Sequence, residues 1–292
     1  MRKVRIATAS FLIEDTPHTV EQNFTQCEQL IMDAAWQEAD ILCLPETVLT
    51  NNVPDGHELP EDFPGRWTEL FQAAAKEHGI AIVAPFFARR EGLIVNQATL
   101  IDNNGEVAGS YRKLQPTGWE ARFVTPGDDL PVLDLAFGKI AIMICMDIYF
   151  PEIARIYAMK GAEVLFWPTT THGPTQPGLE AQLRSRAIDN SLTIVESNLV
   201  GHAPYAPYAG RFYPGNARIM DHDGEIISQT GRRHGLAIAD IDLDEPRRTH
   251  GVFLINEPDN TREDLESLTR MDLYAREYAS LAQAQHRFYD KK

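Results

Sequence analysis

The sequence predicts an α/β protein in which mixed β-sheets carry helices on their outer faces. Short apolar stretches alternate with longer amphipathic ones through most of the chain, which is the pattern of strands connected by helices. Elsewhere, strand-like runs flank an Asn-Gly or an Asp-Gly pair, which indicates hairpins. Because helical connections join parallel strands and hairpins join antiparallel ones, the sheets are expected to be mixed.

The first half of the chain predicts strands and helices in regular alternation, followed by a hairpin. Apolar residues recur at helical spacing in two stretches, and Gly79 directly after the second stretch is typical of a helix C-cap. The expected elements are a strand at 3–9, a helix at 18–38, a strand at 41–45, a helix at 64–78, a strand at 80–85, and hairpin strands at 94–101 and 106–111 joined by Asp102-Asn103-Asn104-Gly105.

The second half repeats the alternation and ends in an amphipathic stretch. It predicts strands at 139–144, 163–167 and 192–197, helices at 151–160 and 179–190, and a hairpin that turns at 222–224. From about Thr261 to Asp290, apolar residues recur every three or four positions, which predicts a tail helix. No repeat or Gly/Ser linker divides the rest. We therefore expect one domain over 1–260 and a helical tail over 261–292 that packs on the domain or on a partner subunit.

Composition narrows the classes of partner. The 292 residues are 43% hydrophobic and 24% charged, as in soluble globular proteins, and no apolar stretch reaches the ~18–20 residues that span a bilayer. We expect no membrane partner. With 42 acidic and 27 basic residues the net charge is −15, so nucleic acid is not an expected partner either.

Three cysteines are too few and too scattered for a disulfide framework, and the N-terminus does not have the pattern of a signal peptide. A reducing, cytoplasmic location is therefore expected. The metal and nucleotide motifs HExxH, GxGxxG and the P-loop are absent, as is the serine hydrolase motif GxSxG, so no metal or cofactor is expected.

Polar residues that follow apolar strands mark the candidate site. Cys145 follows the run 139–144 and precedes Pro151, which suits a first helical turn, so a helix N-terminus is expected to favour its thiolate. Glu46 follows the run 41–45, and Lys113 follows the second hairpin strand. Each feature alone has an ordinary structural explanation, as do Cys27 and Cys43, which we interpret as core residues.

Taken together and in this order, Glu46, Lys113 and Cys145 resemble the catalytic residues of the nitrilase superfamily of carbon–nitrogen hydrolases. The resemblance runs from the first strand to about Asp242. The segments that carry it are Leu44-Pro45-Glu46, Asp102–Glu106 leading into Tyr111-Arg112-Lys113, Ile144–Glu152, and Arg186–Asn190.

This resemblance implies an αββα sandwich of two mixed β-sheets flanked by helices, which associates into a homodimer or a higher homo-oligomer. It also implies a second glutamate on the loop after the lysine, and Glu120 occupies that position. In the implied mechanism Glu46 is the general base and Cys145 the nucleophile that becomes a thioester. Lys113 and the N–H of Met146 stabilise the oxyanion, while Glu120 orients Lys113.

Two sequence motifs indicate different classes of substrate. Cys145-Met146-Asp147 with Phe150-Pro151-Glu152 resembles the amidase and carbamoylase branches, whereas the loop 112–117 resembles nitrilases. We weight the cysteine turn more, which favours a small amide over a nitrile. An N-carbamoyl amino acid would need a cation to bind its carboxylate, and no arginine follows Cys145 closely, so a neutral acyl group is expected.

The residues expected to contact the substrate lie in two segments, the cysteine turn and the loop after the strand at 163–167. They are Met146, Tyr149, Thr170, Thr171 and His172. Two other classes of function stay open. A papain-like enzyme would pair Cys145 with a histidine, and a non-catalytic binding protein would keep the fold without turnover.

Overall fold

A computed structural model describes residues 2–173, 177–203, 210–245, 267 and 269–284. The chain divides into two compact units, residues 1–245 and 246–292, which are considered separately. In the second unit the described element is the helix α6 (Met271–Ala284), which lies inside the predicted tail helix. Residue 267 is also helical, but 269 and 270 are not, so the predicted helix is interrupted there, and its other residues lie outside the described part of the chain. No helix in the described parts of the chain is both long enough and apolar enough to cross a membrane.

The first unit contains two mixed β-sheets that share one long strand. That strand is β10 (Thr193–Ala203), and the remaining strands are β1 (Lys3–Ile13), β2 (Ile41–Cys43), β3 (Glu61–Asp62), β4 (Ala81–Arg90), β5 (Leu93–Ile101), β6 (Val107–Arg112), β7 (Leu133–Leu135), β8 (Gly138–Ile142), β9 (Val164–Pro168), β11 (Arg211–Pro214), β12 (Arg218–Met220), β13 (Ile226–Gln229) and β14 (Gly235–Asp242).

The shared strand joins the sheets because its two halves have different neighbours. Residues 193–197 of β10 pair in parallel with β9, within the order β7-β8-β9-β10-β12-β13. Residues 198–201 pair in parallel with β1, within the order β6-β5-β4-β2-β1-β10, and β14 pairs antiparallel with β1. Parallel and antiparallel pairs therefore occur together in both sheets, as the sequence predicts.

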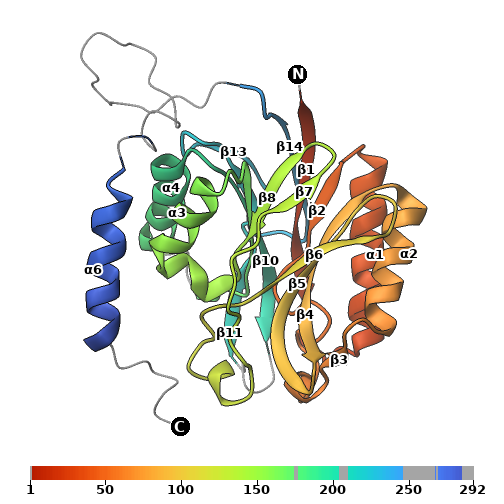
Figure 1. Cartoon of the computed structure of the whole chain (residues 1–292). Helices are drawn as coiled ribbons and strands as arrows, with labels where there is room; N and C mark the ends of the chain where they lie inside the picture. The colour runs from red at the N-terminus through yellow and green to blue at the C-terminus, as the bar shows by residue number, and fades with distance from the viewer. Residues whose placement is uncertain (1, 174–176, 204–209, 246–266, 268, 285–292) are drawn as a thin grey trace. The chain divides into compact units, whose positions relative to one another are not determined.

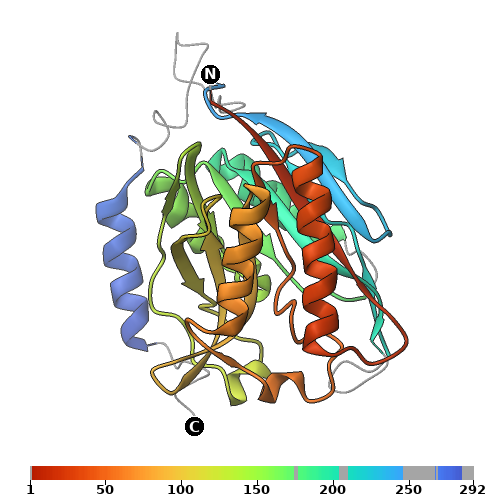
Figure 2. The same ribbon diagram turned by 90° about the vertical axis from the view of Figure 1, so that its right-hand side faces the viewer.

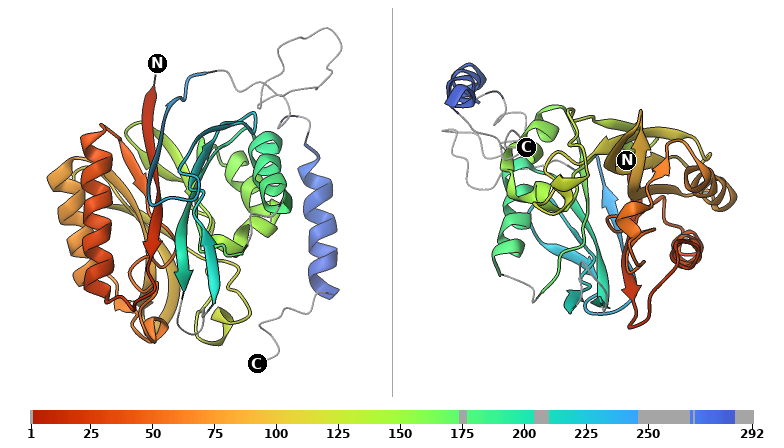
Figure 3. Two further views of the ribbon diagram at one scale, coloured as in Figure 1. Left: turned by 180° about the vertical axis from the view of Figure 1, so that it is seen from behind. Right: turned by 90° about the horizontal axis from the view of Figure 1, so that it is seen from below.

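Helices cover the outer face of each sheet. The helices α1 (Val20–Trp36) and α2 (Arg66–His78) lie on one side, and α3 (Pro151–Met159) and α4 (Pro177–Asn190) on the other (Figure 1; Figure 2 shows the first pair face-on). The view from below in Figure 3 shows the resulting layers, helix–sheet–sheet–helix, in the first unit. This confirms the αββα sandwich.

Successive side chains of each strand point to opposite faces of its sheet, and this explains how the arrangement buries two cores. In β1, Ala7, Ala9 and Phe11 pack in the core beneath α1 and α2, while Val4 and Ile6 point into the core between the sheets. Successive side chains of a strand point to opposite faces, so a strand covered on both sides needs apolar residues at nearly every position. The continuous apolar runs of the sequence are the consequence.

Most predicted elements are present, with boundaries shifted by a few residues. Thr19 caps α1 together with Gln22, and Gly79 ends α2 in the left-handed conformation with φ 65°. The strands β1 and β10 are longer than predicted, and β14 was not predicted. β14 has mostly half-buried residues because it is an edge strand that pairs with β1 alone, so its apolar signal is weak.

Candidate active site

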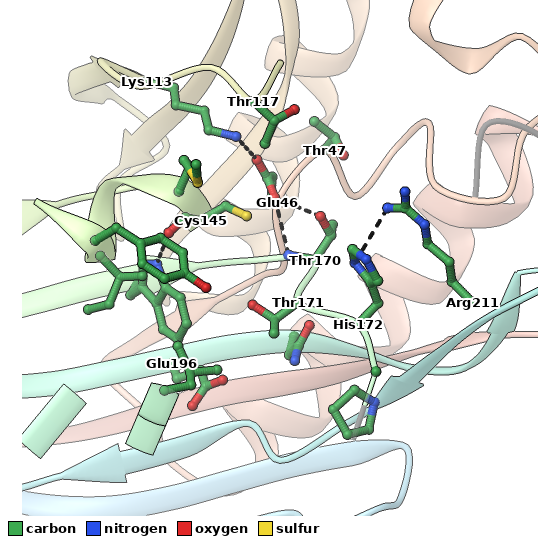
Figure 4. Close-up of a pocket in the computed structure, with 18 of the residues that line it drawn as sticks. Glu46, Thr47, Lys113, Thr117, Cys145, Thr170, Thr171, His172, Glu196 and Arg211 are labelled. Atoms are coloured by element: carbon green, nitrogen blue, oxygen red, sulfur yellow. Dashed lines mark hydrogen bonds and ion pairs between the residues drawn. The ribbon is translucent and has the colours of Figure 1, made fainter. Parts of the chain in front are cut away.

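A cavity of about 520 Å³ opens in the first unit at the ends of strands from both sheets. All nine residues singled out in the sequence line it: Glu46, Lys113, Glu120, Cys145, Met146, Tyr149, Thr170, Thr171 and His172. Figure 4 shows Glu46 between Lys113 and Thr170, with Cys145 on the same side of the cavity. Residues that are far apart in the chain are thus brought to one place.

Cys145 sits on a strained turn between β8 and a short 3-10 helix, η3 (Cys145–Tyr149). Its φ is 46°, a left-handed conformation that costs about 1–3 kcal/mol for a non-glycine residue and needs support from its surroundings. The indole Nε1 of Trp167 donates to the Cys145 carbonyl across 2.9 Å, and Arg186 Nη2 donates to the Ile148 carbonyl across 2.9 Å. The turn is therefore braced at both ends.

Asp147 connects this turn to the loop that carries Lys113. Its carboxylate accepts hydrogen bonds from the backbone N–H of Ile144 (2.8 Å), the backbone N–H of Gln115 (3.0 Å) and the hydroxyl of Tyr111 (2.7 Å). Burial raises the pKa of Asp147 to about 6, although these bonds and the charge of Lys113 act to lower it. One buried side chain thereby fixes the cysteine turn relative to the lysine loop.

Lys113 lies between the two glutamates. Its Nζ donates to Glu46 Oε1 across 2.7 Å and to Glu120 Oε2 across 2.6 Å, and all three side chains are buried. Glu46 Oε2 accepts from both the backbone N–H (3.1 Å) and the hydroxyl (2.8 Å) of Thr170. Thr117 N–H donates to Glu120 Oε2 across 2.8 Å.

Asn96, which was not among the predicted site residues, completes this hydrogen-bond network. Its Nδ2 donates to Glu46 Oε1 (2.9 Å) and to Glu120 Oε1 (2.8 Å), so one amide bridges both carboxylates. It is fully buried in the middle of β5. The available signal was an asparagine within an apolar hairpin strand, but polar residues such as Gln97 and Thr99 follow it and hide the signal.

These contacts determine the protonation states. Burial disfavours a charged lysine, but the negative charges of Glu46 and Glu120 outweigh it and hold the pKa of Lys113 well above its ordinary value. Burial likewise acts to raise the pKa of Glu120, but Lys113 and the hydrogen bonds from Thr117 and Asn96 bring it below its ordinary value. Lys113 is therefore a permanent ammonium at neutral pH, which suits a hydrogen-bond donor and not a base.

The thiol of Cys145 is protonated at rest, contrary to the expectation that a helix N-terminus would favour the thiolate. Burial and the negative charge of Glu46 raise the pKa of Cys145 to about 12, although the charge of Lys113 and a hydrogen bond from Thr169 act in the opposite direction. The turn after Cys145 is a single 3-10 segment, which has a weaker dipole than a long helix. Nucleophilic attack by this residue therefore requires a base.

The cavity is lined by further polar residues. The loop after β9 carries Thr170, Thr171 and His172, and the side chain of Tyr149 is 53% exposed at the cavity rim. Arg211, Glu196 and Arg218 also line the cavity, with Glu196 and Arg218 paired to each other in a buried contact. These three were not among the predicted site residues, because they belong to β10, β11 and β12, which lie far along the chain from Cys145.

Within the described residues, no group of three His, Cys, Asp or Glu side chains is arranged to hold a metal ion.

The chain is similar in sequence to known amidases and to a nitrilase. The chain is 30% identical to the deaminated glutathione amidase of Synechocystis sp., over 84% of the chain and 98% of the relative, and 30% identical to a nitrilase of Pyrococcus abyssi, over 76% and 84%. An omega-amidase of Xenopus laevis is 29% identical over 83% of the chain and 90% of its own length.

Solved structures show the same fold. A carbon-nitrogen hydrolase of Helicobacter pylori superposes with a TM-score of 0.78 at 22% identity, covering 94% of this chain and 97% of the other. An amidase of Nesterenkonia sp. superposes with a TM-score of 0.71 at 25% identity, covering 82% and 91%. The family model for carbon-nitrogen hydrolases matches residues 5–250. The chain therefore belongs to the carbon-nitrogen hydrolase family, as its strand-end residues predicted, and is an enzyme that hydrolyses non-peptide carbon–nitrogen bonds.

Proposed function

We propose that the enzyme hydrolyses a small amide to a carboxylic acid and ammonia through a thioester on Cys145. The observation that carries this proposal is the buried lysine held between two glutamates on the cavity that Cys145 lines. The resemblance of the cysteine turn to the amidase branch and the relatives that are named amidases support an amide as substrate.

In the first half of the reaction, Glu46 takes the proton of the Cys145 thiol as sulfur attacks the amide carbon. The carbonyl oxygen gains negative charge and is stabilised by Lys113 Nζ and the backbone N–H of Met146. Loss of one such donor typically costs ~10²–10³ in kcat. Glu46 then gives its proton to the amide nitrogen, the carbon–nitrogen bond breaks, and ammonia leaves the thioester.

In the second half, water attacks the thioester carbon while Glu46 takes a proton from the water. The carbon–sulfur bond breaks, the carboxylic acid leaves, and the sulfur recovers its proton. Glu120 acts on Lys113, whose ammonium it holds at 2.6 Å, and on the water or substrate beside it. Met146, Tyr149, Thr171 and His172 contact the substrate, and Thr170 positions Glu46 through two hydrogen bonds.

Nitrile hydrolysis is the second candidate function. The lysine loop 112–117 resembles that of nitrilases, and the relative of P. abyssi carries that name. A nitrile would use the same thiol and base but would pass through a thioimidate before the thioester. Hydrolysis of an N-carbamoyl compound is a third variant of the same chemistry.

Ammonia release from matched amides, nitriles and N-carbamoyl compounds, with intact-mass detection of an acyl adduct, tests the proposal. We expect turnover of amides above that of the nitriles, and an adduct on Cys145 that Cys145→Ala lacks. Glu46→Gln and Lys113→Met should each lower kcat at least ~100-fold, whereas Glu106→Gln on the hairpin should match the wild type.

Two results would contradict the mechanism. If folded Glu46→Gln and Lys113→Met variants still acylate at the wild-type rate, a Cys/His mechanism of the papain type becomes the better explanation. If Cys145 reacts with no member of the substrate panel and with no electrophilic probe, the chain is a binding protein that has kept the fold without turnover.

We also propose a cytoplasmic location, a homodimeric or higher oligomeric state, and a helical tail over 261–292 that packs on the domain or on a partner subunit. The three free cysteines support a reducing compartment. In α6, four apolar side chains recur at helical spacing and are about half exposed, namely Met271, Tyr274, Tyr278 and Leu281, which supports a packing role for the tail. Light scattering of the full chain and of a chain ending at residue 260 tests the oligomeric state and the contribution of the tail to it.

A further inference from the structure

Glu196 and Arg218 form an ion pair in the wall of the cavity, apart from the network around Lys113, and neither takes part in the proposed mechanism. They lie directly opposite each other on the antiparallel strands β10 and β12, and Arg218 Nε donates to Glu196 Oε2. Both side chains are more than nine-tenths buried. Because two charges lose their hydration in such a place, the pair needs further hydrogen bonds to be well satisfied.

The sheet register places this pair beside the cysteine turn. Glu196 is the neighbour of Trp167 in the parallel pairing of β10 with β9, and Trp167 Nε1 donates to the carbonyl of Cys145 across 2.9 Å. Neighbouring strands lie roughly 4.8 Å apart, so Glu196 and Arg218 are one and two strands beyond Trp167. In Figure 4, Lys113 and Glu196 lie on opposite sides of Cys145. An amide whose oxygen points to Lys113 can therefore extend its acyl chain toward Glu196.

One oxygen of the Glu196 carboxylate is available to a ligand. Among the described residues, the donor that reaches this carboxylate is Arg218 Nε, and it bonds Oε2, whereas Oε1 has no such bond and is not sealed from solvent. Burial raises the pKa of Glu196, although the charge and the hydrogen bond of Arg218 act to lower it. The carboxylate is thus incompletely stabilised, and a hydrogen-bond donor on the substrate would stabilise it further.

Arg218 supplies hydrogen-bond donors next to this acceptor. Its Nε is used by Glu196, and its Nη1 lies 3.5 Å from Oε2 of Glu180 on α4, which holds the guanidinium in place. A guanidinium has five N–H groups, so these two contacts leave others for a ligand. Because the charges of Glu196 and Arg218 offset each other, the pair presents an acceptor beside a donor without a net charge of its own.

A neutral group that carries a donor next to an acceptor matches this pair. A primary carboxamide has that arrangement, since its NH2 can donate to Glu196 while its carbonyl accepts from Arg218. A carboxylate has no donor and is repelled by Glu196, and an ammonium has no acceptor and is repelled by Arg218. A ketone carries the acceptor alone. The pair therefore favours a carboxamide over charged groups of the same size.

We propose that Glu196 and Arg218 bind a second carboxamide at the far end of the acyl chain, so that the preferred substrates are diamides of short dicarboxylic acids. This inference rests on the proposed amide hydrolysis and names its substrate class. It agrees with the neutral acyl group expected from the sequence and adds a polar end to it. A monoamide product would have to place its new carboxylate against Glu196, so the reaction should stop after one ammonia per diamide.

The test compares five amides of one length that differ in the terminal group. They are succinamide, 4-oxopentanamide, pentanamide, succinamate and 4-aminobutanamide, which end in a carboxamide, a methyl ketone, an alkyl group, a carboxylate and an ammonium. Succinamide has two equivalent amide groups, which by itself doubles its kcat/KM. In the wild type we expect its kcat/KM to exceed that of each other amide about tenfold or more, with ammonia release ending near one equivalent.

A double variant removes both polar groups without leaving an unpaired charge. Replacing a buried ion pair with apolar residues is often neutral for stability, so Glu196→Leu/Arg218→Met is the variant of choice. Its ratio of kcat/KM for succinamide over 4-oxopentanamide should fall to about twofold, mainly through the KM of succinamide. The matched control Glu21→Leu/Arg66→Met removes an exposed ion pair of 3.2 Å that lies outside the cavity, and it should keep the wild-type ratio.

Binding gives a readout that depends neither on turnover nor on the double variant. Calorimetry on Cys145→Ala should show that succinamide binds about tenfold or more tightly than 4-oxopentanamide. Adding Glu196→Leu/Arg218→Met to Cys145→Ala should reduce this difference to about twofold, because both molecules then meet an apolar wall.

Each contrary result has a distinct meaning. A succinamide preference of about twofold in the wild type, or a larger one that survives in Glu196→Leu/Arg218→Met, overturns the carboxamide site and leaves amide hydrolysis intact. A higher kcat/KM for succinamate or for 4-aminobutanamide than for succinamide also overturns it, because the cavity then selects a charged group. Absence of turnover on every amide instead refutes the proposed function itself.

Discussion

Replacing Asn96 with leucine should move the acid limb of the pH–activity profile to higher pH. Asn96 donates one charge-assisted hydrogen bond to Glu46 (2.9 Å) and one to Glu120 (2.8 Å). Bonds of this kind contribute about 1.5–3 kcal/mol, and about 1.4 kcal/mol corresponds to one pKa unit. Removing a donor that favours the ionised carboxylate raises its pKa, so the limb should shift by about 1 to 2 units.

We expect the shift of the acid limb to be nearer one pH unit than two, because each carboxylate keeps other hydrogen-bond donors. Lys113 still bonds both glutamates, and Thr117 still bonds Glu120. Both carboxylates share the ammonium of Lys113, so the expected shift belongs to the apparent pKa of the limb and not to one residue.

The free energy of unfolding of Asn96→Leu, measured as a function of pH, gives a second test of the same hydrogen bonds. The pKa of Glu120 lies below its ordinary value in the folded protein, and Asn96 is one of the causes. A carboxylate with a lowered folded pKa stabilises the protein above its unfolded pKa of about 4.3 and loses that contribution as the pH falls through the folded pKa. Asn96→Leu should therefore be less stable than wild type at pH 7, and the difference should narrow below about pH 4.

The assay is ammonia release, with kcat/KM measured between pH 4.5 and 9. Gln97→Leu is the matched control, because Gln97 is the next residue on β5, is equally buried and bonds Thr99 and Arg90 but neither glutamate. Asn96→Ser keeps one donor and should shift the limb by less. An acid limb that stays in place in Asn96→Leu, or that moves equally in Gln97→Leu, would refute the reasoning.

The remaining predictions concern the thiol, its turn and the base. Because burial raises the pKa of Cys145 to about 12, alkylation by iodoacetamide should be slower than that of free cysteine at pH 7 and should keep rising up to pH 10; a plateau below pH 8 would contradict this. Asp147→Ala leaves two buried donors and one partly buried donor without their acceptor, so thermal unfolding should show a loss of about 3 kcal/mol. The exposed control Asp134→Ala should change stability by less than about 0.5 kcal/mol. Thr170→Val removes the hydroxyl donor to Glu46 but keeps the backbone N–H, so kcat should fall about tenfold with an unchanged melting temperature; an unchanged kcat would show that this bond does not position the base.

The fold follows from sequence wherever a strand is covered on both faces. Three strands have a core on either side, so their sequences are apolar at nearly every position and could be predicted as strands. They correspond to the runs 41–45, 80–85 and 163–167. The strand β14 is a half-buried edge strand, and β11 and β12 are short, so their signals are weak. Burial alone does not show that β10 changes sheets halfway, because residues 193–200, on both sides of the change, are all buried.

The sequence by itself indicated the family through a resemblance carried by Glu46, Lys113 and Cys145, and that resemblance also implied Glu120. Each of the first three follows a predicted strand and therefore emerges at the edge of a sheet, and that constraint is local. Only the tertiary structure decided that Asn96 bridges two carboxylates, that Arg211 reaches the cavity from a distant strand, and that the thiol is protonated at rest. Hydrogen-bond partners and burial depend on side chains from remote segments, and no local pattern in the chain encodes which of these will meet.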